Sequence, residues 1–304
     1  MGIVTSGSFA KALYPGVSKW WGQAYDEWSV EYTDLFEQVS SKRAYEEDVQ
    51  FTGLGLANIK REGAPITFDS MSQGWVTRYV PVNYGLGFII TKEMVEDDLY
   101  GVIGKKRARF LAFSMRQTKE IVAANVYNRA TDSNFTGADA VALFSTAHVN
   151  YTGGTFSNTL TTAADLAEAT LEQSCIDISK LRNDRGLRIS LSADCLVIPT
   201  DLVFEAERIL RSPYRVGTAD NDVNALNHMG KFPKGIKVNH YLTDTDAWFI
   251  RTNLREDGMK CYNRKGVAFG VDNEFDTENA KFKATERYAF GWTDPRGLYG
   301  SVGA

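Results

Sequence analysis

Residues 105–130 have the sequence KKRARFLAFSMRQTKEIVAANVYNRA, and this stretch decides the fold of the chain. It contains neither glycine nor proline, so it predicts one α-helix about 39 Å long at 1.5 Å per residue. The residues whose helical spacing predicts a core-facing stripe are Ala108, Leu111, Met115, Thr118, Val122 and Val126. The helix also carries seven basic residues against a single acid, Glu120. Its remaining surface is therefore either an ordinary solvated face or a face turned toward a polyanion.

An arm rich in aromatic residues, 1–45, precedes this helix. Its large aromatic residues at steps of four, three, four and four are Trp21, Tyr25, Trp28, Tyr32 and Phe36. This spacing predicts one helical stripe. The stripe either covers the core of its own domain or docks on a neighbouring subunit, and Trp20, Trp21 and Trp28 are the candidates for the second role.

The segment 46–90 is predicted to be extended, because six glycines interrupt it and each disfavours a helix. Its second half is rich in β-branched and aromatic residues, as strands are. A long two-stranded hairpin satisfies both observations. If the hairpin projects, its apolar side chains need burial against another chain, and Phe68, Met71 and Trp75 are the candidates for that contact.

The rest of the chain alternates between helical and extended patterns, which predicts an α+β fold. Helices are expected at 91–101, 162–183 and 201–212, and strands at 195–198, 260–271 and 281–292. Residues 235–242 and 247–252 are expected to pair as a hairpin around the turn at 244–246.

Composition excludes several classes of protein. The 304 residues carry 34 basic and 38 acidic side chains, and this balance argues against a dedicated nucleic-acid binder. The three cysteines have neither paired nor metal-binding spacing, so we expect neither disulfides nor zinc. No apolar run is long enough to span a bilayer. The first residues contain no apolar segment and no cleavage motif, so we expect no secretory signal. We therefore expect that the protein does not associate with membranes and that it is made in a reducing compartment.

No catalytic motif was found. The three histidines, His148, His228 and His240, are far apart in sequence, and each is expected to be structural or on the surface. Nucleophilic-serine and phosphate-loop motifs are absent, so we expect no cofactor and no enzymatic activity. The acids Glu93, Glu96, Asp97 and Asp98 could bind a divalent ion, but a solvated acidic helix face is the simpler interpretation.

Five short segments around the long helix carry a resemblance to a known family: IITKEMVEDDLYG (89–101), LFSTAH (143–148), DRGLRI (184–189), FEAERIL (204–210) and WTDPRG (292–297). In this order and spacing, the chain resembles the major capsid proteins of tailed bacteriophages, which have the HK97-type fold. It most resembles the branch that contains the Mu-type major head subunit.

The resemblance implies a named layout. Residues 1–45 would be the N-arm and 46–90 the E-loop, followed by a P-domain at 91–190 that contains the spine helix at 105–130. Residues 191–260 would be the A-domain, and 261–304 would form strands that return to the P-domain.

The resemblance also implies a function and partners. The chain would be a structural subunit that assembles as hexamers and pentamers into an icosahedral shell around double-stranded phage DNA. Its partners would include a portal and a separate scaffolding protein, and it would be made in the host bacterial cytoplasm and end in the virion. The basic residues expected to face DNA are Lys105, Lys106, Arg107 and Arg109. The alternative is an encapsulin-like nanocompartment shell that encloses cargo protein.

Overall fold

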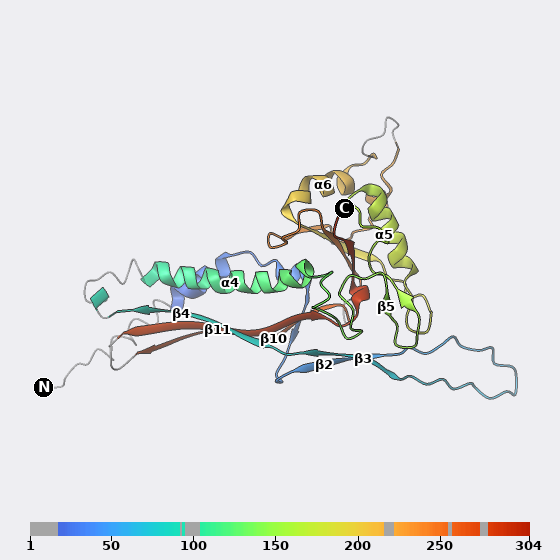
Figure 1. Cartoon of the computed structure of the whole chain (residues 1–304), viewed down its shortest axis with the longest axis horizontal. Coiled ribbons are helices and arrows are strands. Elements are labelled where there is room, and N and C mark those ends of the chain that lie inside the picture. Colours follow the sequence, from blue (N-terminus) through green and yellow to red (C-terminus); the bar gives the residue numbers. More distant parts are fainter. Residues whose placement is uncertain (1–17, 92, 95–103, 216–221, 255–256, 274–278) are drawn as a thin grey trace.

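The structure is a computed structural model that describes residues 18–91, 93–94, 104–215, 222–254, 257–273 and 279–304. It has three parts: a long helix lying along an elongated sheet, a compact α/β body at one end, and a loop that projects beyond that body (Figure 1). The predicted α+β class is confirmed.

The long helix α4 spans Lys105–Asn128, as predicted to within two residues. It lies on a sheet with the strand order β1-β10-β11-β4. The strands are β1 (Glu37–Ser40), β10 (Met259–Asn273), β11 (Ala280–Trp292) and β4 (Val82–Ile90). The pairs β10–β11 and β11–β4 are antiparallel, whereas β1 runs parallel to β10.

The compact body contains a second sheet with the order β12-β9-β7-β8. Its strands are β7 (Ala193–Ile198), β8 (Ile236–Val238), β9 (Trp248–Thr252) and β12 (Leu298–Ser301). The helices of this region are α5 (Glu168–Lys180), η2 (Thr200–Leu202), α6 (Val203–Arg211), α7 (Ala225–His228) and η3 (Pro295–Gly297). Two short strands, β5 (His148–Val149) and β6 (Thr155–Phe156), pair beside it.

The predicted hairpin of 235–242 with 247–252 is wrong. β8 pairs parallel to one edge of β7, and β9 pairs antiparallel to the other edge. All six residues of β7 are buried, and a central strand of this kind needs hydrogen-bonding partners on both sides. The last strand, β12, pairs with β9, so the chain ends in the compact body and not beneath α4.

The core-facing stripe of α4 was predicted correctly only in its first half. Ala108, Leu111 and Met115 are buried, but Thr118, Val122 and Val126 are only partly buried. In the second half the buried face includes two charged residues, Lys119 and Glu120, each with its own partner elsewhere in the chain, together with alanines. Apolar patterning missed this face because ionic side chains are seldom buried unless they are paired.

The aromatic arm is not one helix. Helical residues 18–27 are followed by a break and by the short helix α2 (Tyr32–Leu35). Trp21 is 6% exposed and stacks on Phe269 of β10, and Phe36 packs in the cluster that joins α4 to the compact body. The described part of the arm, 18–45, therefore covers part of the core of its own chain, as in the first of the two alternatives that the sequence left open. Contact of Trp20, Trp21 and Trp28 with a neighbouring subunit stays a prediction.

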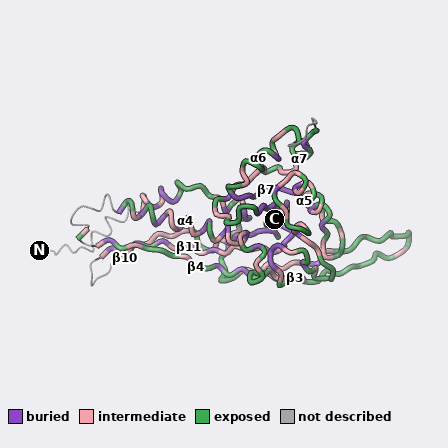
Figure 2. Tube along the Cα trace, turned by 45° about the horizontal axis from the view of Figure 1, so that its top comes forward, coloured by how far each residue is buried: buried purple, intermediate pink, exposed green. Residues whose placement is uncertain are grey.

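The segment 46–90 divides between two sheets. β2 (Glu46–Phe51) and β3 (Gln73–Tyr79) form the expected antiparallel hairpin, and residues 52–72 between them form the projecting loop. β4 instead joins the sheet beneath α4. Figure 2 shows the projecting loop exposed along most of its length. Most of the expected helix at 91–101 lies outside the described residues, as do Glu96, Asp97 and Asp98.

The N-terminus of α2 is stabilised by a side chain from α4. Glu120 is fully buried, and its carboxylate accepts hydrogen bonds from the backbone N–H groups of Glu31 (3.1 Å) and Tyr32 (2.8 Å). Burial raises the pKa of Glu120, and the two backbone donors oppose this rise. This contact fixes residues 31 and 32 of the arm on the middle of the long helix.

We expect Glu120→Ala to lower the free energy of unfolding by about 2–3 kcal/mol, because two N–H groups at a packed helix end lose their acceptor. Chemical denaturation measures this loss. Glu120→Gln keeps one acceptor oxygen and should lose less. Equal stability of Glu120→Ala and the unaltered protein would contradict the assigned capping contact.

Candidate functional site: the projecting loop and its root

The projecting loop presents large apolar side chains to solvent. Ile59 is 95% exposed and Phe68 is 92% exposed. The other exposed apolar residues of the loop are Leu54, Leu56, Ile66 and Met71. Exposed apolar side chains gathered on one segment mark a surface that binds another protein.

The base of this loop is held at three places, which together we call the loop root. The first is Asp48 on β2. Its carboxylate contacts Lys260 Nζ at 2.5 Å, the Tyr262 hydroxyl at 2.6 Å and the Thr293 hydroxyl at 2.8 Å. Burial alone would raise the pKa of Asp48, but these hydrogen bonds outweigh burial and hold the pKa below its ordinary value. The ionised carboxylate therefore ties the hairpin to β10 and to the segment after β11.

The second contact of the loop root is Arg185, in the turn that follows α5. Its guanidinium donates to the carbonyl oxygens of Gly53 and Ser70, each at 3.0 Å, and to Asp69 Oδ1 at 2.9 Å. These three acceptors lie on both limbs of the projecting loop. One planar side chain therefore holds the two limbs together where they leave the body.

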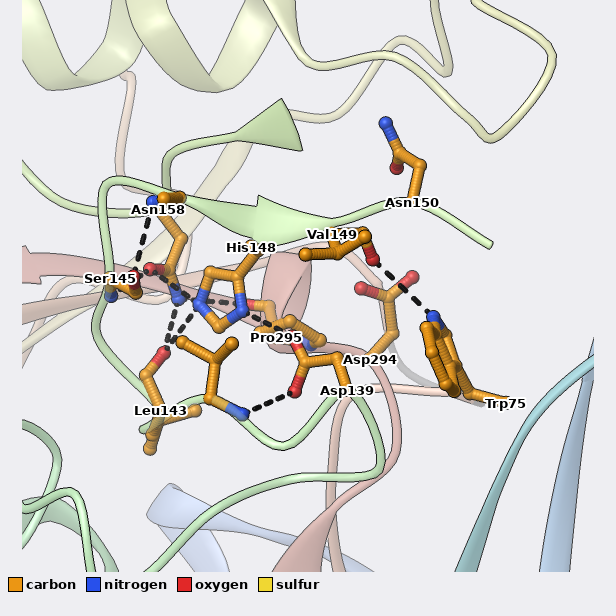
Figure 3. Close-up of polar contacts among 12 residues, drawn as sticks. Trp75, Asp139, Leu143, Ser145, His148, Val149, Asn150, Asn158, Asp294 and Pro295 are labelled. Atoms are coloured by element: carbon orange, nitrogen blue, oxygen red, sulfur yellow. Dashed lines mark hydrogen bonds and ion pairs between the residues drawn. The ribbon is translucent and has the colours of Figure 1, made fainter. Parts of the chain in front are cut away.

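The third contact is Trp75 on β3. Its indole N–H donates to the Val149 carbonyl at 3.3 Å (Figure 3). Its ring also meets the Tyr151 ring edge to face, with the ring centres 5.5 Å apart. Trp75 was predicted to contact another subunit. The structure places it at the loop root, where its own chain occupies part of its surface.

Beneath Val149 lies a buried polar cluster, and Figure 3 shows its side chains converging. Asn158 donates from Nδ2 to the carbonyls of Leu143 (2.7 Å) and Pro295 (3.1 Å), and its Oδ1 accepts from Ser145 N. His148 contacts Asp139 Oδ2 at 2.6 Å through Nδ1. The cluster therefore joins the segment 139–158 to the C-terminal segment.

Arg296, which is also buried, continues this cluster. Its guanidinium contacts Asp294 at 3.0 Å and Asn150, and it lies over the Phe156 ring at 3.8 Å. It also approaches Asp184 at 3.8 Å. The sequence segments 143–148, 184–189 and 292–297 thus meet around the loop root, although they are far apart along the chain.

Of the four basic residues at the start of α4, the two lysines are exposed to solvent and the two arginines contact other parts of the chain. Lys105 and Lys106 are exposed. Arg107 donates to the Ile89 carbonyl, and Arg109 pairs with Glu27 at 2.8 Å on the exposed surface. Of the four predicted DNA-facing residues, two are thus engaged within the chain.

The apolar candidates for contact with another subunit differ in how far their own chain buries them. Trp20 is partly buried against the core beneath α4, and Trp21 is buried there. Trp28 is partly exposed and meets Phe113 of α4 at 4.7 Å. Phe68 and Met71 are the candidates whose surface their own chain leaves open.

Sequence reasoning missed two of the three residues of the loop root, Asp48 and Arg185, and two residues of the polar cluster beneath it, Asn158 and Arg296. Asp48, Arg185, Asn158 and Arg296 are isolated polar residues with no local motif, and only the tertiary fold brings them together. The one available signal was that Arg185 and Arg296 lie in two of the segments that carried the family resemblance.

The three histidines lie in different places. His148 is buried in the polar cluster, His240 contacts Glu31 on the surface at 2.6 Å, and His228 ends α7. Within the described residues, no three histidine, cysteine or acidic side chains gather as a metal site. No helix in the described part of the chain has the length and apolar character to cross a membrane.

A family model described as phage capsid protein matches residues 75–301, about three quarters of the chain. The chain belongs to this family. It is therefore a structural major capsid protein of a bacteriophage, and its place is the capsid of the virion. No curated protein matches the sequence.

Solved structures show the same fold at low sequence identity. The native GTA particle capsid has a TM-score of 0.55 and 9% identity, over 89% of each chain. The procapsid of bacteriophage JBD30 has a TM-score of 0.54 and 12% identity, over 97% of this chain and 75% of that one. A virus-like particle from Pyrococcus furiosus has a TM-score of 0.51 and 8% identity, over 94% of this chain and 97% of that one. The expected HK97-type fold is confirmed.

We expect Asp48→Asn to loosen the projecting loop, because a neutral amide cannot replace the carboxylate opposite Lys260. Hydrogen exchange of residues 46–79 should become faster, while exchange in β7 and β9 stays unchanged.

In the unaltered protein, acid should have the same effect. The pKa of Asp48 is lower in the folded state than in the unfolded state, so its stabilising contribution is present above the ordinary aspartate pKa of about 3.9. The contribution is lost as the pH falls from there through the lower folded value. Asp48→Asn should show no further loosening in this range, and an equal acid response in both proteins would contradict the role of Asp48.

Proposed function

We propose that this capsid protein is the major head subunit of a tailed phage and resembles the Mu-type branch. Copies assemble through hexamers and pentamers into a closed icosahedral shell around double-stranded DNA. The observation that supports this proposal is an apolar loop that projects from a root held by side-chain hydrogen bonds and that its own chain leaves uncovered.

The energetic reason for assembly lies in this loop. Burying one large apolar side chain contributes about 1.5–3 kcal/mol, and each subunit carries six such side chains on the projecting loop. A loop that reaches away from its own body can cover a different surface patch on a neighbour. Such contacts are heterologous, because they join two different surface patches. They build a closed assembly when the repeated rotation from one subunit to the next returns to the first subunit.

The proposal assigns parts of the chain to the layout of this fold. Residues 1–45 are the N-arm, 46–90 the E-loop, and 91–190 the P-domain with its spine helix. Residues 191–260 are the A-domain, and 261–304 are the return segment, whose last strand pairs within the A-domain sheet.

Further partners follow from the same proposal. A portal and a separate scaffolding protein take part in assembly, and the subunit is made in the cytoplasm of a bacterial host. The subunit has no enzymatic activity of its own. Packaged DNA meets the exposed ammonium groups of Lys105 and Lys106, which bind phosphates without regard to base sequence.

Electron microscopy of the purified full chain, combined with analysis of particle contents, tests the proposal. Closed shells with nuclease-protected DNA from phage-infected cells support a phage head. Closed shells filled with one cargo protein would instead identify a nanocompartment. A protein that stays monomeric at high concentration, with and without scaffolding protein, would contradict both.

We expect the double variant Ile59→Ser and Phe68→Ser to remain folded but to form few or no shells. The loop surface loses its apolar contact area, while the side chains changed contribute little to the core of the single chain. Sedimentation and electron microscopy measure assembly, and circular dichroism checks folding. The matched control, Ile59→Leu with Phe68→Leu, keeps the apolar surface and should assemble. Normal shells from the serine variant would exclude the loop as an assembly surface.

We expect Lys105→Gln with Lys106→Gln to leave shells intact but to reduce the DNA that they retain, most clearly at raised salt. Salt weakens phosphate contacts, so a shell with fewer cations loses DNA sooner. The control, Lys180→Gln with Arg188→Gln, removes the same charge from exposed positions in the compact body. Equal DNA retention by both variants would show that the start of α4 has no special role in holding DNA.

A further inference from the structure

A groove opens beside the second half of α4, at the end of the long sheet nearest the compact body (Figure 1). Its volume is about 720 Å³, within the range of roughly 300–1,000 Å³ that is usual for ligand sites. Most of its lining is apolar and comes from four elements: Val122 and Val126 of α4, Val76 of β3, Val82 and Tyr84 of β4, and Phe290 of β11.

One wall of the groove is a strand edge that its own sheet leaves without a partner. β11 pairs with β10 along its whole length, but β4 pairs with it only as far as Tyr288. β3 approaches residues 289–292 of β11 and yet pairs only with β2. Alternate residues of a strand direct their N–H and C=O groups to each side. Residues 289–292 therefore offer backbone groups to which an extended segment can add as a strand.

Two buried hydroxyl groups of the groove lack hydrogen-bond partners. They are Thr77 Oγ1 and Tyr288 Oη, and neither has a partner within the residues that the structure describes. Tyr288 is 1% exposed. Leaving a buried hydroxyl unpaired is unfavourable, so a bound segment that supplies partners gains from these contacts.

The charge of the groove is positive. Arg78 and Arg129 line it, and its lining contains no acidic side chain. Arg78 is engaged by Glu47 at 2.9 Å, whereas the guanidinium of Arg129 lies over the Phe135 ring at 4.4 Å. The N–H groups of a guanidinium stacked on a ring stay available to a carboxylate. The groove therefore favours an acidic partner.

The apolar segments of a second copy do not match this charge. The tip of the projecting loop carries Lys60 and Arg61 against the single acid Glu62. Residues 1–17 contain Lys11 and no acid. Charge complementarity thus favours a segment of a different protein over a second copy of this chain.

We propose that this groove binds an extended, acidic segment of another protein, which adds as a strand to residues 289–292 of β11. Its apolar side chains occupy the groove beside α4, and one of its carboxylates accepts hydrogen bonds from Arg129. The proposal concerns a surface of the single chain and does not depend on shell assembly.

Fluorescence anisotropy with the full chain tests the proposal. The probe is a coumarin-labelled hexapeptide of alternating valine and glutamate, and its counterpart has lysine in place of glutamate. The acidic peptide should bind saturably and more weakly as salt rises, and the basic peptide should bind at least about tenfold more weakly. No saturable binding of the acidic peptide up to millimolar concentration, or equal binding of both peptides, would overturn the proposal.

Hydrogen exchange locates the bound peptide. The acidic peptide should slow exchange of backbone N–H groups within residues 289–292 and leave exchange in β7 unchanged. Binding without this protection would overturn strand addition. Dodecanoate examines the other ligand class that an apolar groove with a cation accepts, and displacement of the peptide only by this amphiphile, and not by unlabelled acidic peptide, would also overturn the proposal.

Variants examine the two polar groups of the groove. Arg129→Gln should weaken binding of the acidic peptide about tenfold and remove the preference for acid. The matched control, Arg208→Gln, removes an exposed arginine from α6 and should bind as the unaltered protein does. Tyr288→Phe keeps the ring, removes the unpaired hydroxyl, and should weaken binding while the protein stays folded. Unchanged affinity in Arg129→Gln would overturn the placement of the acidic segment in this groove.

Discussion

The rest of this structure depends on how α4 lies on its sheet. The contact is apolar at its start, where Ala108, Leu111 and Met115 face β11, but its middle is ionic. There Lys119 meets Glu286, and Glu120 receives the backbone N–H groups of α2. A buried ion pair costs desolvation and contributes little net stability, but breaking it leaves an uncompensated charge. Such a contact therefore fixes the position of the helix along the sheet, because a shift by one turn would leave charges unpaired.

A fixed helix position matters because the projecting loop has no core of its own. Its limbs are held by Asp48 from the side of the long sheet and by Arg185 from the side of the compact body. The direction of the loop is thus set by the long sheet and by the compact body, and these two parts must be fixed relative to each other. The cluster around Tyr127, Phe249 and Leu298 provides that joint, because it contains residues of α4 and of the second sheet. A loop directed in this way loses less conformational entropy on binding a neighbour than a free loop would.

Local patterns in the sequence were enough to predict α4, β10, β11 and the β2–β3 hairpin, because each has a long periodic or β-branched signal. They failed where tertiary pairing decides the structure. β8 and β9 are close in sequence, but the apolar strand β7 lies between them. The arm was predicted as one helix because its aromatic spacing is regular. The helix is instead interrupted at residues 28–31, and Glu120 caps the short helix α2 that follows. Of the loop root, Asp48 and Arg185 could not be predicted, and neither could Arg296 in the adjoining polar cluster. These residues carry no spacing signal, and only the fold brings them together.

The distribution of apolar surface has a further consequence for the single chain. The exposed side chains at the tip of the projecting loop flank the charged residues Lys60, Arg61 and Glu62. These charges keep the tip solvated and disfavour pairing of the loop with another unpaired strand edge, a common route to aggregation. The apolar side chains on the limbs can still be buried when a neighbour presents a complementary surface. A loop that must stay soluble in the free subunit and become buried in the shell needs both kinds of residue, and the loop root decides which surface it can reach.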